Sequence, residues 1–126
     1  FRLAQALEKL EGVSVNYPLL ESSPYHELAE KQLSGKGGAI LTIRAGSKER
    51  AYKLINHLKY VKIATNIGDV RTLVIHPAST IYIHSTPEAM EEAGVYDDTI
   101  RISVGIEDIK DLIKDFTEAV ESLGEE

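Results

Sequence analysis

The sequence predicts a two-layer α/β domain in which helices cover one face of a mixed, largely antiparallel sheet. Two observations support this fold class. Segments with apolar residues at helical spacing alternate with short strand-like stretches, and the loops between them are short. The chain has 126 residues, of which 43% are hydrophobic, as expected for one folded domain. No repeat or linker divides it, so residues 1–126 are predicted to form a single domain.

The first half of the chain contains predicted helices that alternate with predicted strands. In order, we expect a helix over 2–11, a strand over 13–17, a helix over 24–33, a strand over 39–44 and a helix that follows Ser47. Gly12 ends the first helix. Ser23 and Ser47 are predicted N-caps of the second and third helices, and Pro24 takes the first helical position of the second.

The second half continues the pattern and closes with its clearest elements. We expect a short strand over 61–64, a loop over 65–70, a strand over 72–75, a short helix after Thr86, a strand over 99–106 and a closing helix. The region 61–76 has the spacing of a hairpin. Glu107 and Asp108 are predicted to cap the closing helix and to complement its dipole. The apolar face of strand 99–106, predicted to contact the helices, consists of Ile100, Ile102, Val104 and Ile106.

The opposite face of strand 99–106 carries Arg101 between small residues. In a complete single-domain protein this face meets water, and Arg101 is a solvated arginine. In a fragment the face meets the missing part of the protein, and Arg101 is free to bind a ligand there. The chain opens at Phe1 within a helical pattern, so we expect an upstream segment, with residues 1–11 as the end of a helix between domains. The residue pattern alone favours the solvated arginine.

Composition excludes several functional classes. A net charge of −6 argues against a nucleic-acid surface and against binding to anionic membranes. The absence of cysteine excludes disulfides, thiolate metal sites and a cysteine nucleophile, and the histidines are too scattered to predict a metal site. No apolar run approaches the roughly 20 residues of a membrane span. We therefore expect a cytoplasmic protein that binds a small molecule or another domain.

The sequence contains four further motifs, YPLLESSPY at 17–25, NIGD at 66–69, HPAST at 76–80 and IRISVGIED at 100–108. Together they resemble the C-terminal domain of the Cys/Met-metabolism enzymes that depend on pyridoxal phosphate (PLP). Each motif is weak alone, but their order and spacing match across almost the whole chain. Within the family, the Glu21-Ser22-Ser23-Pro24 segment and Asn66 look most like O-acetylhomoserine sulfhydrylases. The resemblance implies the α/β small domain of a fold-type I PLP enzyme.

The resemblance also implies roles for individual residues. Arg101 matches the arginine that binds the substrate α-carboxylate, and Asn66 matches a loop position beside that carboxylate. A planar guanidinium suits the task because it can grip a carboxylate at two points. Other candidates that would line the active site are Ile67, His76, Ser79 and Thr80, although each of the three polar ones is also explained as a turn residue. The amino-acid substrate and a missing PLP-binding domain are the implied partners, within a homo-oligomer.

Some family features are changed or absent. Ile81 and Tyr82 stand where sulfhydrylases usually have threonine and histidine, and Leu19 replaces a usual glycine. The family's PLP lysine and phosphate-binding motifs do not occur in this sequence, so we expect the 126 residues alone to bind no PLP covalently and to be inactive. We also expect the isolated chain to self-associate. Cystathionine γ-synthase, a γ-lyase and a stand-alone amino-acid-binding domain remain alternatives.

Overall fold

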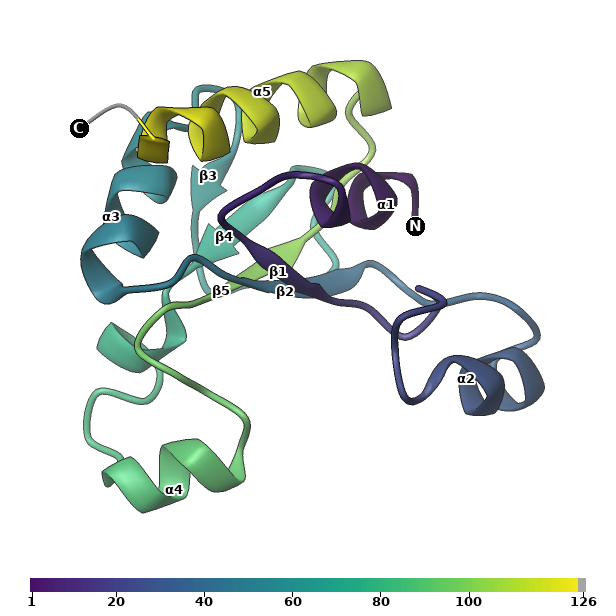
Figure 1. Cartoon of the computed structure of the whole chain (residues 1–126), viewed down its shortest axis with the longest axis horizontal. Coiled ribbons are helices and arrows are strands. Elements are labelled where there is room, and N and C mark those ends of the chain that lie inside the picture. The colour runs from purple at the N-terminus through teal and green to yellow at the C-terminus, as the bar shows by residue number, and fades with distance from the viewer. Residues whose placement is uncertain (125–126) are drawn as a thin grey trace.

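The computed structural model describes residues 1–124, which form a five-stranded sheet with helices packed across one face (Figure 1). The strand order is β1-β2-β5-β4-β3. Neighbouring strands are antiparallel except for β3 and β4, which are parallel. The predicted mixed, largely antiparallel sheet is therefore confirmed. Its strands are β1 (Ser14–Asn16), β2 (Ile40–Arg44), β3 (Lys62–Ile63), β4 (Leu73–Ile75) and β5 (Thr99–Ser103).

Three of the α-helices form the helical layer, in which α5 contacts both α1 and α3. Figure 1 shows these helices together on one side of the sheet, with α4 on the other side and α2 beyond the sheet. Helix α2 buries only Ala29, and α4 buries no side chain, so neither has an apolar stripe to pack on the sheet. The α-helices are α1 (Arg2–Glu8), α2 (His26–Gln32), α3 (Lys48–His57), α4 (Pro87–Glu92) and α5 (Ile109–Glu121).

The main core lies between this helical layer and the sheet. Strand β5 contributes Ile100 and Ile102, which are fully buried, and each such side chain stabilises the fold by about 1.5–3 kcal/mol. The predicted strand 99–106 is too long, because β5 ends at Ser103. Ile106, predicted on its apolar face, is 83% exposed. The helices and β2 complete the core with fully buried Leu3, Leu7, Ile43, Leu54, Leu112 and Phe116.

Two of the predicted helix caps, Ser47 and Asp108, are present, and Thr86 caps α4 as well. The side chains of Ser47, Thr86 and Asp108 each accept a hydrogen bond from a backbone N–H in the first turn of α3, α4 and α5. The predicted cap at Ser23 is wrong. Its hydroxyl accepts from the N–H of Tyr25 in a local turn, and α2 begins only at His26. A Ser-Pro pair favours such turns as well as helix starts, so the motif is ambiguous.

The predicted hairpin over 61–76 is also wrong, because β3 and β4 run in the same direction. Lys62 N–H donates to Thr72 O, and Ala64 N–H donates to Val74 O. In a parallel pair, the connection has to bring the chain back to the end of the sheet at which the first strand began. Residues 64–72, which we call the crossing loop, make this return over the face of β5 that lies opposite the helices.

Glu107 does not cap α5 as predicted. Its carboxylate instead accepts two hydrogen bonds from Thr72, which directly precedes β4. The backbone N–H of Thr72 donates to Oε2 and its hydroxyl donates to Oε1, each at 2.8 Å. Asp108 alone caps the helix. Burial raises the pKa of the Glu107 carboxyl, but the hydrogen bonds from Thr72 outweigh it and hold that pKa below its usual value.

We expect Glu107 to make the folding of this chain sensitive to acid. Its pKa is lower when folded than when unfolded, so its stabilisation is present above the unfolded value of 4.5 and is lost as pH falls through the folded value. Glu107→Gln should lower the free energy of unfolding by about 1–2 kcal/mol at pH 7. That difference from wild type should shrink as the pH approaches 3. Urea unfolding between pH 3 and 7 measures it.

Exposed Glu11 provides the control, since Glu11→Gln removes a carboxylate of the same kind. Its effect on unfolding should be small at every pH, because a solvated surface group loses little on substitution. A Glu107→Gln effect that stays constant between pH 3 and 7 would contradict the prediction.

Candidate functional site

The face of the sheet opposite the helices carries the predicted substrate residue. Arg101 lies in the middle of β5, where it pairs with Thr42 of β2 on one side and Ile75 of β4 on the other. Because paired residues share a face, Leu73, which pairs with Ser103, lies there too. Leu73 and Ile75 are both buried although they point away from the helices. This second face is therefore covered by chain segments near β4 and not open to water along its whole length.

Alternate residues of segment 101–107 bind the crossing loop at successive points. Within β5 this spacing follows from the two-residue period of a strand, which places residues 101 and 103 on one side. Gly105 and Glu107 bind the loop after the strand has ended. Glu107 holds Thr72, as described above. The remaining contacts are Arg101 Nη2–H to Thr65 O at 2.8 Å, Gly68 N–H to Ser103 Oγ at 3.2 Å and Gly105 N–H to Thr72 Oγ1 at 2.9 Å.

Gly105 allows the crossing loop to lie directly on the chain after β5. A Cβ atom at this position would overlap the carbonyl oxygen of Val70 and come within 2.6 Å of the carbonyl carbon of Arg71. The neighbouring Ile106 N–H donates to Val70 O at 2.9 Å, which fixes the close approach. Any larger residue at 105 must therefore push the loop away from the strand.

Arg101 differs in its partners from Arg44 and Arg50. It is half-buried, and its one described hydrogen bond goes to Thr65 O. Within residues 1–124 no acidic side chain forms an ion pair with it. In contrast, Arg44 pairs with Asp98 at 2.9 Å, and half-buried Arg50 donates to three backbone carbonyls. An arginine carries five N–H donors, so the guanidinium of Arg101 keeps donors and an uncompensated charge for an anionic ligand.

Asn66 and Ile67 lie in the crossing loop beside this guanidinium. Asn66 directly follows Thr65, whose carbonyl accepts from Arg101, and Ile67 directly precedes Gly68, which is bound to Ser103. Both side chains are exposed, and no hydrogen bond of the Asn66 side chain is present within the described chain. The structure therefore brings the loop of Asn66 to Arg101. Contact of either residue with a substrate stays a prediction.

His76, Ser79 and Thr80 form a hydrogen-bonded turn at the end of β4. His76 is 4% exposed, and its Nε2 faces the carbonyl oxygen of Asp97, so Nε2–H is the donor there. The other ring nitrogen, Nδ1, then accepts from the Ser79 hydroxyl at 2.7 Å. Thr80 donates its hydroxyl to His76 O, and the ring of Tyr52 packs edge-on against the imidazole. These contacts support the interpretation of the three residues as turn residues.

The same turn adjoins the sheet position of Arg101. Ile75, which immediately precedes His76, is the register partner of Arg101, and the 3₁₀ turn Pro77–Ser79 contacts β5. Arg101 and the crossing loop thus share one face of the sheet, whereas the ring of His76 packs against Tyr52 of α3, and Ser79 and Thr80 bond to His76. The sequence analysis missed Ser103 and Glu107, although their alternation with Arg101 and Gly105 was the available signal.

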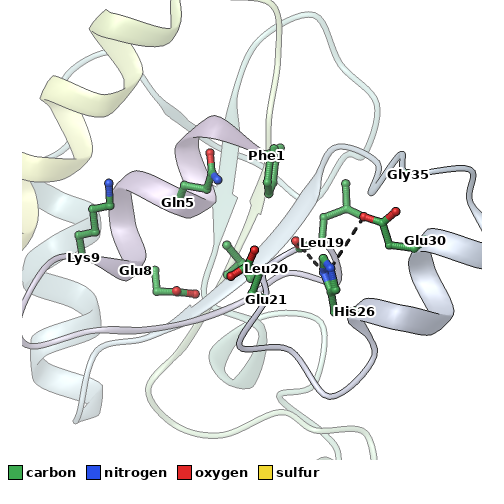
Figure 2. A pocket seen from close by; sticks show the side chains of 10 residues that line it. All are labelled: Phe1, Gln5, Glu8, Lys9, Leu19, Leu20, Glu21, His26, Glu30 and Gly35. Carbon is green, nitrogen blue, oxygen red and sulfur yellow. Dashed lines mark hydrogen bonds and ion pairs between the residues drawn. The ribbon is translucent and has the colours of Figure 1, made fainter.

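A separate hollow of about 520 Å³ lies between α1 and α2 (Figure 2). None of the predicted site residues lines it. Its polar side chains include Glu8, Glu21 and Glu30, and His26 hydrogen-bonds Leu19 O through Nδ1 at 3.0 Å. His26 Nε2 lies 3.8 Å from the Glu30 carboxylate, and no arginine is among the residues that line the hollow. We therefore place the candidate site at Arg101 and not in this hollow.

The residues present fit the substrate end of a PLP site better than its lysine end. A Schiff-base lysine needs a desolvated setting that lowers its pKa. Every lysine within residues 1–124 is exposed. Arg101, by contrast, is a half-buried cation without a carboxylate partner among residues 1–124. Its charge is therefore available to a substrate carboxylate.

No helix among residues 1–124 is long and apolar enough to cross a membrane. In the same residues, no three side chains of the metal-binding types converge on a point where an ion could sit.

Comparison with known proteins identifies the family. The family profile of the Cys/Met metabolism PLP-dependent enzymes matches residues 1–121. O-acetyl-L-homoserine sulfhydrylase 1 of Thermus thermophilus is 43% identical over 115 residues, which cover 90% of this chain and 27% of the relative. The homocysteine synthase of Schizosaccharomyces pombe is 46% identical over 123 residues, which cover 96% and 29%. Other relatives include O-succinylhomoserine sulfhydrylases and L-methionine γ-lyases.

A solved structure shows the same fold. It is described as an O-acetylhomoserine (thiol)-lyase from Campylobacter jejuni that carries N'-pyridoxyl-lysine-5'-monophosphate. Its TM-score to this chain is 0.87 at 35% identity, and the match covers 95% of this chain and 29% of that one. The chain thus spans less than a third of the length of these relatives. It belongs to the Cys/Met metabolism PLP-dependent enzyme family.

Proposed function

We propose that this chain is the C-terminal small domain of an O-acetylhomoserine sulfhydrylase and supplies the wall of the active site that binds the substrate α-carboxylate. The observation that carries the proposal is Arg101, a half-buried residue at the centre of β5 whose guanidinium has no carboxylate partner among residues 1–124. The two relatives with the highest identities above, which are named a sulfhydrylase and a homocysteine synthase, support the choice of reaction. In that reaction sulfide displaces acetate from Cγ of O-acetyl-L-homoserine to give homocysteine.

Arg101 would act by orienting the bound substrate. PLP, held by the rest of the enzyme, supplies the electron sink that stabilises negative charge at Cα. The guanidinium binds the α-carboxylate at two points, which fixes the bond at Cα that can break. The Thr65 carbonyl holds one edge of the guanidinium at 2.8 Å and leaves the other edge for the substrate. Asn66, at the adjacent loop position, would donate a further hydrogen bond to the carboxylate.

The other parts of the reaction would come from outside these residues. The exposed lysines of this chain are unsuited to hold PLP, so the cofactor lysine would belong to a separate, larger domain of the full protein. The isolated 126 residues would then be inactive. Helix α1 (Arg2–Glu8) would be the end of a helix that joins the two domains.

A γ-lyase is a second candidate, because L-methionine γ-lyases are among the relatives at 38–39% identity. Ile81 and Tyr82, where the sequence departs from the sulfhydrylase pattern, follow directly on Thr80 in the turn at the end of β4. Assay of the full protein with O-acetyl-L-homoserine plus sulfide, with cysteine as the nucleophile, and with methionine alone separates the sulfhydrylase from a γ-synthase and a lyase.

We expect Arg101→Lys in the full-length enzyme to lower kcat/KM for the amino-acid substrate. Lysine keeps the charge but loses the fork, so the loss should be about 10- to 100-fold, equivalent to about 1.5–3 kcal/mol of a charge-assisted contact. Steady-state kinetics with varied O-acetyl-L-homoserine measures it. Arg44→Lys is the control, because Arg44 lies on the neighbouring strand but pairs with Asp98. Equal effects of the two substitutions would contradict the proposal.

The isolated chain is expected to self-associate through the region around the crossing loop. Apolar side chains are exposed there, and uncovered apolar groups of this kind usually mark a contact surface. They are Ile63, Ile67, Val70 and Ile106. In the full protein, the larger domain or another subunit would cover them.

Sedimentation of the isolated chain at increasing concentration tests this expectation. The wild-type chain should form dimers or larger species, and the double substitution Val70→Lys and Ile106→Lys should weaken them. Leu28→Lys on α2 is the matched control, because Leu28 is also exposed and apolar but lies far along the chain from the loop. A wild-type chain that stays monomeric at high concentration would contradict the prediction.

A further inference from the structure

Thr72 is the most fully bonded residue of the crossing loop. It is completely buried, and each of its polar atoms has a partner. Its N–H and hydroxyl both donate to the Glu107 carboxylate at 2.8 Å. Its hydroxyl oxygen accepts from Gly105 N–H at 2.9 Å, and its carbonyl accepts from Lys62 N–H at 3.2 Å. Thr72 therefore fixes the C-terminal end of the loop to the chain that follows β5.

The N-terminal end of the same loop holds Arg101. Thr65 O is the one acceptor of its guanidinium among the described residues, so the position of this carbonyl sets the orientation of the side chain. Between Thr65 and Thr72, the loop touches the strand through the neutral bonds of Gly68 and Val70. Asp69 binds only its near neighbour Arg71 and does not tie the loop to β5.

The strongest tie between the loop and the strand is thus made by Glu107. Hydrogen bonds to a carboxylate are roughly twice as strong as those between neutral groups, and this carboxylate accepts two. Glutamine at 107 would keep the length but offer only one acceptor oxygen for the two donors of Thr72. Glu107 and Arg101 are therefore connected through one short loop that is held at both ends.

We propose that Glu107 is a positioning residue for the substrate carboxylate, because by binding Thr72 it fixes the crossing loop and hence the Thr65 carbonyl that orients Arg101. The inference rests on the proposed role of Arg101 as the carboxylate-binding residue. Glu107 itself would not touch the substrate. Its loss would leave Arg101 in place on β5 but allow its guanidinium to turn away from the geometry that two-point binding needs.

The test uses the full-length, PLP-loaded enzyme with Glu107→Ala and Asp108→Ala. Asp108 is a matched control, since it is the adjacent carboxylate and caps α5 but has no contact with the loop. The substrate is O-acetyl-L-homoserine, compared with its α-carboxamide, which lacks the carboxylate charge. Hydrogen–deuterium exchange of residues 64–72 is measured in parallel, because it reports the loop without depending on turnover.

Glu107→Ala should raise KM for the carboxylate substrate about tenfold, as expected for a weakened charge-assisted contact, with little change for the carboxamide. The amides of Gly68 and Thr72 should exchange faster. Asp108→Ala should lower the thermal midpoint by removing the cap, yet leave the preference for the carboxylate unchanged. Thr72→Val, which keeps the backbone bond to Glu107, should reduce the preference by a smaller factor of about three.

Arg101→Ala separates failure of this inference from failure of the proposed function. If Arg101→Ala removes the preference for the carboxylate but Glu107→Ala and Thr72→Val do not, Glu107 has no positioning role. If Arg101→Ala also leaves the preference intact, the carboxylate-binding function proposed for this chain is wrong, and the inference fails with it. If Glu107→Ala does not fold, Thr72→Val alone decides, because an unchanged preference in that variant overturns the inference.

Discussion

The site depends on the two-residue period of residues 100–103 in β5 and on the segment 104–107, which continues from it along the crossing loop. The even positions Ile100 and Ile102 enter the core between the sheet and the helices. The odd positions, from Arg101 to Glu107, bind the crossing loop on the other face. A slip of one residue in the pairing of β5 would exchange the two sets, burying the arginine and exposing the isoleucines. Core packing therefore fixes the direction in which Arg101 points.

The sequence predicted most elements of this arrangement because their signals are local. Neighbouring residues alone determine the caps at Ser47 and Asp108, the helix start after Thr86 and the alternation through β5. The parallel pairing of β3 and β4 could not be predicted in this way, since strand direction follows the path of the connecting loop through space. Ile106 was misplaced for a related reason: the alternation continues after Ser103, but the crossing loop ends the pairing there.

The candidate site was predicted in part. Residue type and burial do not distinguish Arg101 from Arg50, since both are half-buried arginines. Their hydrogen-bond partners distinguish them. Arg50 donates to three backbone carbonyls, whereas Arg101 donates to one. The role of Glu107 was mistaken because a carboxylate next to a helix start predicts a cap. Its actual partner, Thr72, is 35 residues away in the chain, and no local rule connects the two.

Under the proposed function, substrate recognition and cofactor chemistry would be divided between parts of one enzyme. The cofactor would be held elsewhere, while β5 and the crossing loop hold the guanidinium of Arg101 in place within this domain. A charge held in advance by hydrogen bonds does not have to be ordered when the substrate arrives, which lowers the cost of binding. Because the loop lies on the outer face of the sheet and not in the core, its exposed residues Asn66 and Ile67 could vary between family members without disturbing the helices. Differences in substrate among relatives that share this fold are then expected to lie in the loop, and the shared carboxylate contact in the strand.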